Sequence, residues 1–216
     1  MNKTYSNGSA LSEALLKGVD TLADNVASTL GPKGRNVILY HKEQNTPVVT
    51  KDGVTIAKFV ELDDPVEHVG AQIVKQAAEQ SANTAGDGTT TTTVLARAMI
   101  REAQKYIVSG VSPIEIKRGM DQACEQIVET LKESARQIRS EEDLRDIATI
   151  SANNDKSIGT LVSTAVDKAG KDGSVLIEEA RSMKTTLDLI EGFRFDSGYL
   201  ASAFITNERS GTVEYD

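Results

Sequence analysis

The chain has 216 residues, 39% of them hydrophobic, and a formal net charge of -8, which suits one or two folded domains. The acidic balance and the lack of tryptophan argue against nucleic acid as a partner, because phosphates would be repelled and few rings could stack on bases. No apolar run approaches the roughly 18 residues of a membrane span, so we expect no membrane partner. The first residues lack a secretory pattern and a single cysteine fits a reducing compartment, so we expect a cytoplasmic protein.

Helical patterns dominate the first 136 residues. Apolar residues that recur at spacings of three and four predict four helices, at about 9–30, at about 65–82, from the threonine run to near 110, and from 113 to about 136. Two short extended runs, 36–40 and 46–50, predict a hairpin that is followed by a turn at Lys51-Asp52-Gly53. Cys124 falls within the last of these helices, where we expect a small core residue.

The sequence pattern changes after Arg139. Two further helices are expected within 141–151 and 154–170, the second capped by Asn154 or Asp155. Strand patterns then follow at 174–178, 185–192, 193–200 and 203–215. The sequence therefore predicts an α+β fold, mainly α-helical at first and then a smaller mixed segment, with boundaries near 135 and 191.

The run GDGTTTTT at residues 86–93 suggests a phosphate cradle. Gly86 and Gly88 allow close backbone approach, and the free N–H groups at the start of the following helix favour an anion. Asp87 would repel a bare phosphate but suits one that arrives with Mg²⁺. The alternative is that Asp87 only caps the next helix and the threonines are merely tolerated there.

Two other loops could converge on the same place. Residues 29–35 combine a helix end with two glycines and two cations, and residues 50–53 add a carboxylate and a lysine. Taken singly, residues 29–35 are a helix stop and residues 50–53 are a hairpin turn. His41 and His68 lie in no catalytic or zinc motif, so we expect solvent-facing or packing roles for both.

Six motifs together resemble a group I, GroEL-type chaperonin subunit: TLGPKGRNV, TKDGVTIAK, VGAQIVKQAA, AGDGTTTTTVLA, TISANND and EGFRFDSGYL. The resemblance covers nearly all of the chain, and a complete subunit of that family is more than twice as long. It implies that residues 1–134 are the N-terminal part of an equatorial ATP-binding domain. Residues 135–190 would be the first half of an intermediate hinge domain, and residues 191–216 the start of an apical substrate-binding domain.

The resemblance also implies the site residues. Those that match the nucleotide pocket are Thr29, Leu30, Gly31, Pro32, Lys51, Asp87, Gly88, Thr89, Thr90 and Thr91. Asp87 matches the Mg²⁺ ligand and Asp52 a carboxylate implicated in hydrolysis, while a K⁺ ion would lie near Lys51 and the end of the first helix. Tyr199 and Phe204 match the apical surface that holds substrate proteins, although Ala203 stands where the family usually carries another aromatic.

By the same resemblance the chain is expected to belong to an ATP-dependent chaperone. Its cofactors would be ATP, Mg²⁺ and K⁺, and its partners unfolded client proteins, a co-chaperonin and further copies in a homo-oligomeric ring. Residues 1–216 alone are expected to lack ATP hydrolase activity, because the family's pocket needs later segments. Two alternatives stay open: a truncated homologue that binds or inhibits without turnover, and an unrelated Mg-nucleotide phosphotransferase that uses the same loops.

Overall fold

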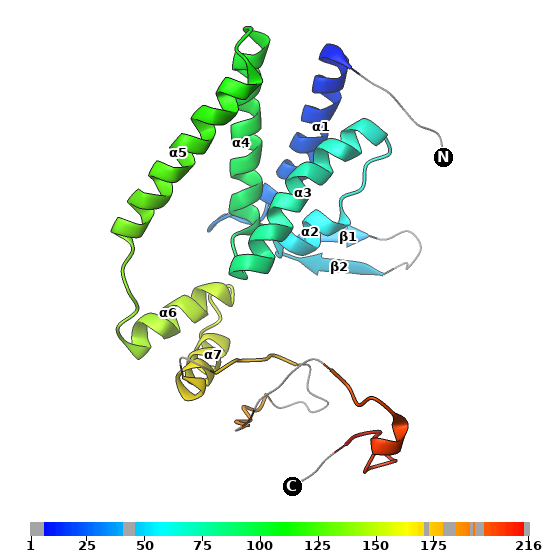
Figure 1. The fold of residues 1–216 in the computed structure, drawn as a ribbon, viewed down its shortest axis with the longest axis vertical. Coiled ribbons are helices and arrows are strands. Elements are labelled where there is room, and N and C mark those ends of the chain that lie inside the picture. Colours follow the sequence, from blue (N-terminus) through cyan, green and yellow to red (C-terminus); the bar gives the residue numbers. More distant parts are fainter. Residues whose placement is uncertain are drawn as a thin grey trace. The chain divides into compact units, whose positions relative to one another are not determined.

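The computed structural model describes residues 7–40, 46–170, 173–178, 185–190, 192 and 197–213. The described chain is mostly helical with one two-stranded sheet, which confirms the α+β class (Figure 1). It divides into two compact units, Met1–Arg136 and Gln137–Asp216, each taken by itself below. The assignment of segments to equatorial, intermediate and apical domains stays a prediction.

The first unit contains five helices and a hairpin within its described residues: α1 (Gly8–Ala27), β1 (Val37–Tyr40), β2 (Pro47–Thr50), α2 (Gly53–Phe59), α3 (Pro65–Ala85), α4 (Thr89–Val108) and α5 (Pro113–Ser134). The described part of the second unit contains α6 (Glu141–Ser151), α7 (Lys156–Ala169) and a 3₁₀ turn, η1 (Ser202–Phe204).

Local sequence signals explain the limits of α3. The Asp64 carboxylate accepts hydrogen bonds from the backbone N–H groups of Val66 and Glu67, at 2.8 and 3.0 Å, so it caps the helix start. Pro65 occupies the first helical position, where no N–H is needed. Gly86 ends the helix in the left-handed conformation, with a φ of 72°.

Helix α2 lies where the sequence predicted only a turn. Asp52 is its N-cap, and the helix begins at Gly53, inside the expected turn. Seven residues give less than two full periods of apolar spacing, so the pattern did not reveal the helix. The local signal was the cap itself, an aspartate three residues before a threonine.

The predicted hairpin is confirmed. Strands β1 and β2 pair antiparallel, with Val37 opposite Thr50 and Tyr40 opposite Pro47. Leu39 turns into the core of the unit, while its neighbour Ile38 is exposed, as the alternation of a strand requires. His41 lies outside the described residues.

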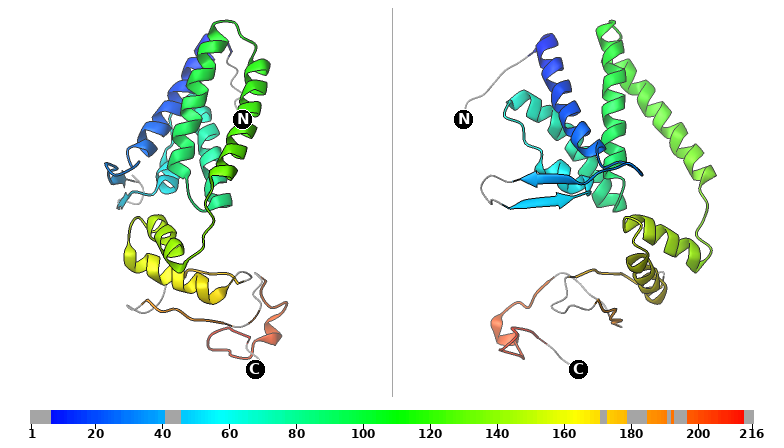
Figure 2. Two further views of the ribbon diagram at one scale, coloured as in Figure 1. Left: turned by 90° about the vertical axis from the view of Figure 1, so that its left-hand side faces the viewer. Right: turned by 180° about the vertical axis from the view of Figure 1, so that it is seen from behind.

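The core of the first unit forms where α1, α2, α3 and α4 pack together (Figure 2). Leu22, Val26, Ile56 and Val74 are its largest fully buried apolar side chains. Helices α1 and α3 approach very closely, because a Cβ atom on Gly70 would lie 2.1 Å from the Leu15 carbonyl oxygen.

Ion pairs hold α4 against α1. Arg101 makes two hydrogen bonds of 2.8 Å to the Asp20 carboxylate, and Arg97 pairs with Asp24 one turn nearer the start of α4. These partners are partly exposed, so the two pairs add little to stability. Their value is geometric, because they fix the register of the two helices.

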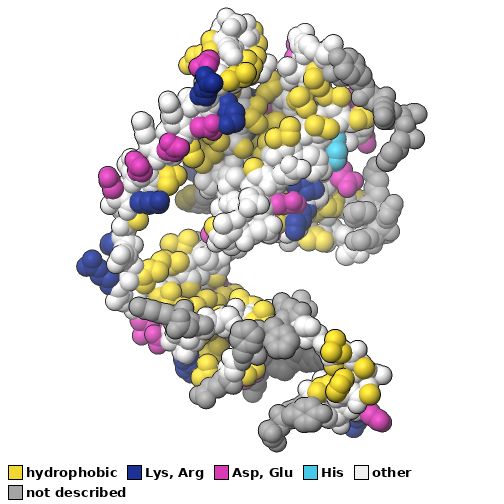
Figure 3. All heavy atoms as spheres, viewed as in Figure 1, with side chains coloured by type: hydrophobic (Ala, Val, Ile, Leu, Met, Phe, Trp, Pro, Cys, Tyr) yellow, Lys and Arg dark blue, Asp and Glu magenta, His cyan; other side chains and the backbone are white. Residues whose placement is uncertain are grey.

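Helix α5 leaves α4 at the turn between them and diverges along its length (Figures 1 and 2). None of its residues is buried, although Ile114, Ile127 and Leu131 are apolar. Acidic side chains line its outer edge (Figure 3).

The expectation of a core position for Cys124 is wrong, since this cysteine is exposed. A helical apolar stripe predicts a face that can be buried, but burial needs an element packed against it.

The two helices predicted in the second unit are present and pack on each other. Asp155, one of the two predicted caps, accepts hydrogen bonds from the N–H groups of Ser157 and Ile158, at 2.9 and 3.2 Å. A Cβ atom on Gly159 would lie 2.2 Å from the Thr149 hydroxyl oxygen, so the contact requires glycine.

The strand predictions after α7 are wrong for the residues that the structure describes. Segments 173–178 and 185–190 are not in strands, because extended backbone becomes a strand only when another segment pairs with it. Between 197 and 213 the structure has η1 and an isolated antiparallel bridge from Asn207 to Thr212 instead of longer strands. Residues 191, 193–196, 214 and 215, which belong to three of the predicted strands, lie outside the described part.

Candidate functional site

The end of α1 and the starts of α2 and α4 meet at one place. A Cβ atom built on Gly53, the first residue of α2, would lie 2.5 Å from the Thr90 hydroxyl oxygen and 3.5 Å from Val26 Cγ1. Each of the three loops that the sequence analysis expected to converge therefore adjoins one of these helix ends. Two helix N-termini bring partial positive charge to this junction.

The loop after α1 folds back on the helix end. The Thr29 hydroxyl donates to the Val26 carbonyl at 2.8 Å, and the Arg35 N–H donates to the Ser28 carbonyl at 3.0 Å. Gly31 is left-handed, with a φ of 72°. Gly34 lies so close to Thr29 that a Cβ atom would stand 2.0 Å from the Thr29 carbonyl oxygen. Leu30, Gly31 and Pro32 are left exposed at the tip of this folded loop.

Asp87 stands between two left-handed glycines. Gly86 and Gly88 have φ values of 72° and 85°, which only glycine adopts without strain. Asp87 is exposed, and its Oδ1 atom accepts a hydrogen bond from the Gly88 N–H at 2.6 Å. The alternative that Asp87 caps α4 is wrong, because the N-cap residue is Gly88 and the helix has no side-chain cap.

The five threonines divide between packing and the site. Thr89 and Thr93 are buried, and the Thr93 hydroxyl donates to the Thr89 carbonyl at 2.8 Å. Thr93, which is not among the predicted site residues, is therefore part of the buried interior. Thr90 is half-buried against Gly53, and Thr91 is exposed.

The start of α4 has the properties of an anion site. The first N–H groups of a helix have no carbonyl partner within the helix, and Gly88 brings no side chain to replace one. The first intrahelical bond runs from the Thr92 N–H to the Gly88 carbonyl, at 2.8 Å. The N–H groups of Thr89, Thr90 and Thr91 precede that bond, so these threonines offer backbone donors whether or not their side chains are buried.

Asp52 combines two tasks. Its Oδ2 atom accepts hydrogen bonds from the Thr55 N–H and the Thr55 hydroxyl, at 2.7 and 2.5 Å, and so caps α2. Its own N–H donates to the Thr50 hydroxyl oxygen at 3.0 Å, which fixes the loop before it. Asp52 and Lys51 are both exposed, so their charged groups remain accessible to a ligand.

Residues 22–212 match the TCP-1/cpn60 chaperonin family, which is nearly the whole chain. The chain belongs to this chaperonin family. It is also similar to a crystal structure of a group III chaperonin in the open state, with 30% sequence identity and a TM-score of 0.62. That match covers 76% of this chain but 33% of the other, so the chaperonin chain described here spans about a third of that relative's length. The narrower assignment to group I stays a prediction from the motifs.

The predicted client-binding residues lie in the other unit of the chaperonin chain. Phe204 is the last residue of η1 and is 53% exposed, and Tyr199 is 49% exposed. Leu200 between them is almost fully exposed. An apolar surface for client proteins is compatible with these side chains but stays a prediction.

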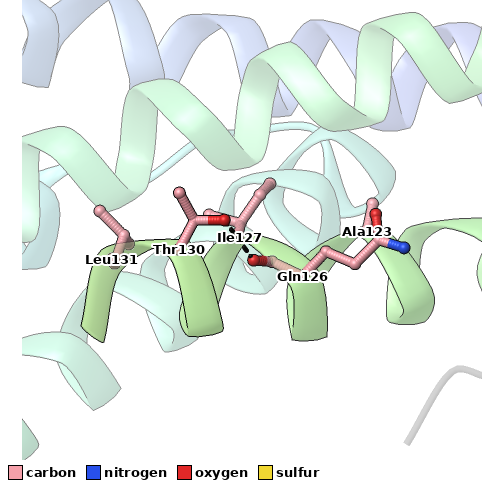
Figure 4. Close-up of a pocket in the computed structure, with 5 residues that line it drawn as sticks. All are labelled: Ala123, Gln126, Ile127, Thr130 and Leu131. Atoms are coloured by element: carbon pink, nitrogen blue, oxygen red, sulfur yellow. Dashed lines mark hydrogen bonds between the residues drawn. The ribbon is translucent and has the colours of Figure 1, made fainter. Parts of the chain in front are cut away.

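A shallow hollow on α5 is separate from the candidate site. It is lined by residues of α5 alone: Ala123, Gln126, Ile127, Thr130 and Leu131 (Figure 4). The Thr130 hydroxyl donates to the Gln126 carbonyl at 2.9 Å, so this hydroxyl bonds within its own helix. Among the described residues, no helix combines the length and apolarity needed to cross a bilayer.

Sequence reasoning missed two residues at the candidate site. Gly53 was interpreted as a turn residue, yet it is buried at the start of α2 against Thr90. Ser81, near the end of α3, donates its hydroxyl to the Asp87 carbonyl at 3.1 Å. A serine in a helical run carries no sequence signal for such a contact, because its target lies beyond the helix.

Proposed function

We propose that this chain is part of an ATP-dependent chaperone subunit that encloses unfolded proteins and promotes their folding in a homo-oligomeric ring. The single observation that carries the nucleotide part is the uncapped start of α4, set against Gly53 and the end of α1. Membership of the chaperonin family supports the chaperone part.

In this proposal the chain's own groups bind the phosphates. The N–H groups of Thr89, Thr90 and Thr91 donate to phosphate oxygens, and the α4 dipole favours the negative charge. Thr90, fixed by its contact with Gly53, adds a hydroxyl donor. Lys51 offsets charge from the neighbouring loop, and Thr29, Leu30, Gly31 and Pro32 form the wall at the end of α1.

The residues present suit a metal that arrives with its nucleotide. Within the described part of the chain, no group of three or more histidine, cysteine or acidic side chains could hold a metal by itself. Asp87 would hold Mg²⁺ together with phosphate oxygens, and the ion would neutralise charge that develops during phosphoryl transfer. K⁺ is proposed near Lys51 and the end of α1.

Asp52 is the proposed catalytic residue. Asp52 is exposed, and the next residue, Gly53, packs against Thr90 at the start of α4, so the Asp52 carboxylate would orient a water molecule or polar group near the terminal phosphate. Because the same carboxylate caps α2, its position is fixed by two hydrogen bonds from Thr55. Positioning of this kind dominates the catalysis of phosphoryl transfer.

The remaining parts of the proposal concern partners. Tyr199 and Phe204 would contact unfolded clients, and a co-chaperonin would close the ring in the cytoplasm. The test uses the full-length protein and measures both phosphate release and the recovery of a chemically denatured enzyme. We expect both to require Mg-ATP and to fail together in Asp87→Ala. Normal recovery without hydrolysis would instead favour the truncated, binding-only homologue, and hydrolysis without recovery would favour a phosphotransferase.

A further inference from the structure

The Ser81 hydroxyl makes a hydrogen bond in the opposite direction along the chain from those of Thr21 and Thr93. Serine and threonine hydroxyls in helices commonly donate to a carbonyl four residues earlier. Thr21 and Thr93 do so here, at 2.8 Å each. Ser81 reaches forward instead, out of α3, and donates to the Asp87 carbonyl at 3.1 Å.

This contact fixes the peptide unit between Asp87 and Gly88. A trans peptide is planar, and its C=O and N–H groups point in opposite directions. Because the Asp87 carbonyl points back to Ser81, the Gly88 N–H must point away from α3. In this orientation the N–H donates to Asp87 Oδ1 at 2.6 Å, so the same peptide also orients the carboxylate.

The flanking residues cannot fix that peptide by themselves. Gly86 and Gly88 are both left-handed, and glycine changes its backbone angles at little cost. The preceding point of attachment is the bond from the Gly86 N–H to the Ala82 carbonyl, at 2.9 Å. The Gly88 Cα carries its hydrogen toward Ser81, since a Cβ atom there would lie 3.3 Å from the Ser81 hydroxyl oxygen.

We infer that Ser81 is a positioning residue for nucleotide binding, which acts by holding the Asp87–Gly88 peptide in the orientation in which the Gly88 N–H holds the Asp87 carboxylate toward a metal-bound phosphate. The inference rests on the proposed function, because it concerns the same site. In this inference Ser81 contacts neither the metal nor the phosphate. It sets the direction of the Asp87 carboxylate, which would hold the metal.

The test is calorimetric titration of Mg-ADP into the full-length protein. We expect Ser81→Ala to raise the dissociation constant about five-fold, as the loss of one hydrogen bond that orients the site would do. Ser81→Thr keeps the hydroxyl and should restore the parent value. Ser134→Ala is the control, because Ser134 is also near the end of its helix and its hydroxyl donates to a backbone carbonyl, that of Thr130, at 2.7 Å.

A purely structural role would change the temperature of unfolding, so this temperature is measured for every variant. The inference requires weaker Mg-ADP binding in Ser81→Ala at an unchanged unfolding temperature. It is overturned if Ser81→Ala binds like the parent, if Ser81→Thr fails to restore binding, or if Ser134→Ala weakens binding equally. Failure of the parent to bind Mg-ADP would overturn the proposed function itself, and this inference with it.

Discussion

Gly53 packs directly against Thr90, since a Cβ atom on Gly53 would lie 2.5 Å from the Thr90 hydroxyl oxygen. This contact joins the residue after Asp52 to the second residue of α4. Any displacement between the two loops therefore changes the position of the proposed catalytic carboxylate relative to the proposed phosphate donors.

We expect Gly53→Ala to destabilise the first unit by about 1–3 kcal/mol, because the added methyl group must displace the Thr90 hydroxyl. Mg-ADP binding should weaken in the same variant. Thermal unfolding and calorimetry measure the two effects. In a Thr90→Ala background the cost of Gly53→Ala should shrink, since the obstructing hydroxyl is gone.

Gly119→Ala is the control for that experiment. Gly119 lies within α5, and a Cβ atom there would meet nothing within 4 Å. Replacing it should stabilise the helix by roughly 0.5–1 kcal/mol, since alanine loses less backbone freedom than glycine. Equal destabilisation by both substitutions would show that the Thr90 contact is not the cause.

Asp52 must be tested with two substitutions, because it both caps α2 and is the proposed catalytic residue. Asp52→Ala should lose the cap, at a cost of about 1 kcal/mol, together with the carboxylate. Asp52→Asn keeps a capping oxygen and removes only the charge. We expect Asp52→Asn to bind ATP like the parent and to hydrolyse it at least about ten-fold more slowly. Hydrolysis at the parent rate in Asp52→Asn would remove Asp52 from the mechanism.

Asp87→Ala should weaken ATP binding in the presence of Mg²⁺ but not in its absence. Loss of the proposed metal ligand should weaken Mg-ATP binding at least ten-fold, about 1.4 kcal/mol. Binding of metal-free ATP should not weaken, because a negative charge is removed and the Gly88 N–H is released from Asp87. Calorimetry with Mg²⁺ and with a chelator measures both. Asp121→Ala, which removes an exposed carboxylate on α5, should change neither value.

The Asp64 cap should make the stability of the first unit depend on pH in the acid range. Hydrogen bonds from the N–H groups of Glu67 and Val66 lower the pKa of its carboxyl below the ordinary value of 3.8. The cap therefore contributes fully above pH 3.8 and loses its contribution as the pH falls through the lowered pKa. Asp64→Asn keeps a capping oxygen without a titrating group, so its unfolding temperature should fall less between neutral and acid pH. Asp63→Asn should show the parent's pH dependence, since it leaves the capping carboxyl in place.

Much of the first unit could be predicted from the sequence. The long helices α1, α3 and α4 have several periods of apolar spacing and clear end signals, such as Asp64-Pro65 and Gly86, so their existence followed from local preferences. The hairpin followed from its two extended runs. Helix α2 could not be predicted in this way, because its seven residues show too little periodicity and its cap resembles a turn.

The strand predictions in the second unit fail for a different reason. Segment 173–178 has strand-forming residues, but a strand depends on a partner elsewhere in the chain, which local preference cannot supply. Cys124 shows the same limit for burial. An apolar helical stripe predicts which face is suited to a core, whereas contact with another element decides whether it becomes one.

By itself, the sequence determined the helical character of the first unit, the family, and the loops in which a nucleotide site is expected. Only the tertiary structure decided how these loops meet. The contact of Gly53 with Thr90, the burial of Thr89 and Thr93, and the bond from Ser81 to Asp87 all join segments from different elements. Such contacts depend on how the helices pack against one another. Packing brings together residues from different elements, and the local sequence around each residue does not show which partner it will meet.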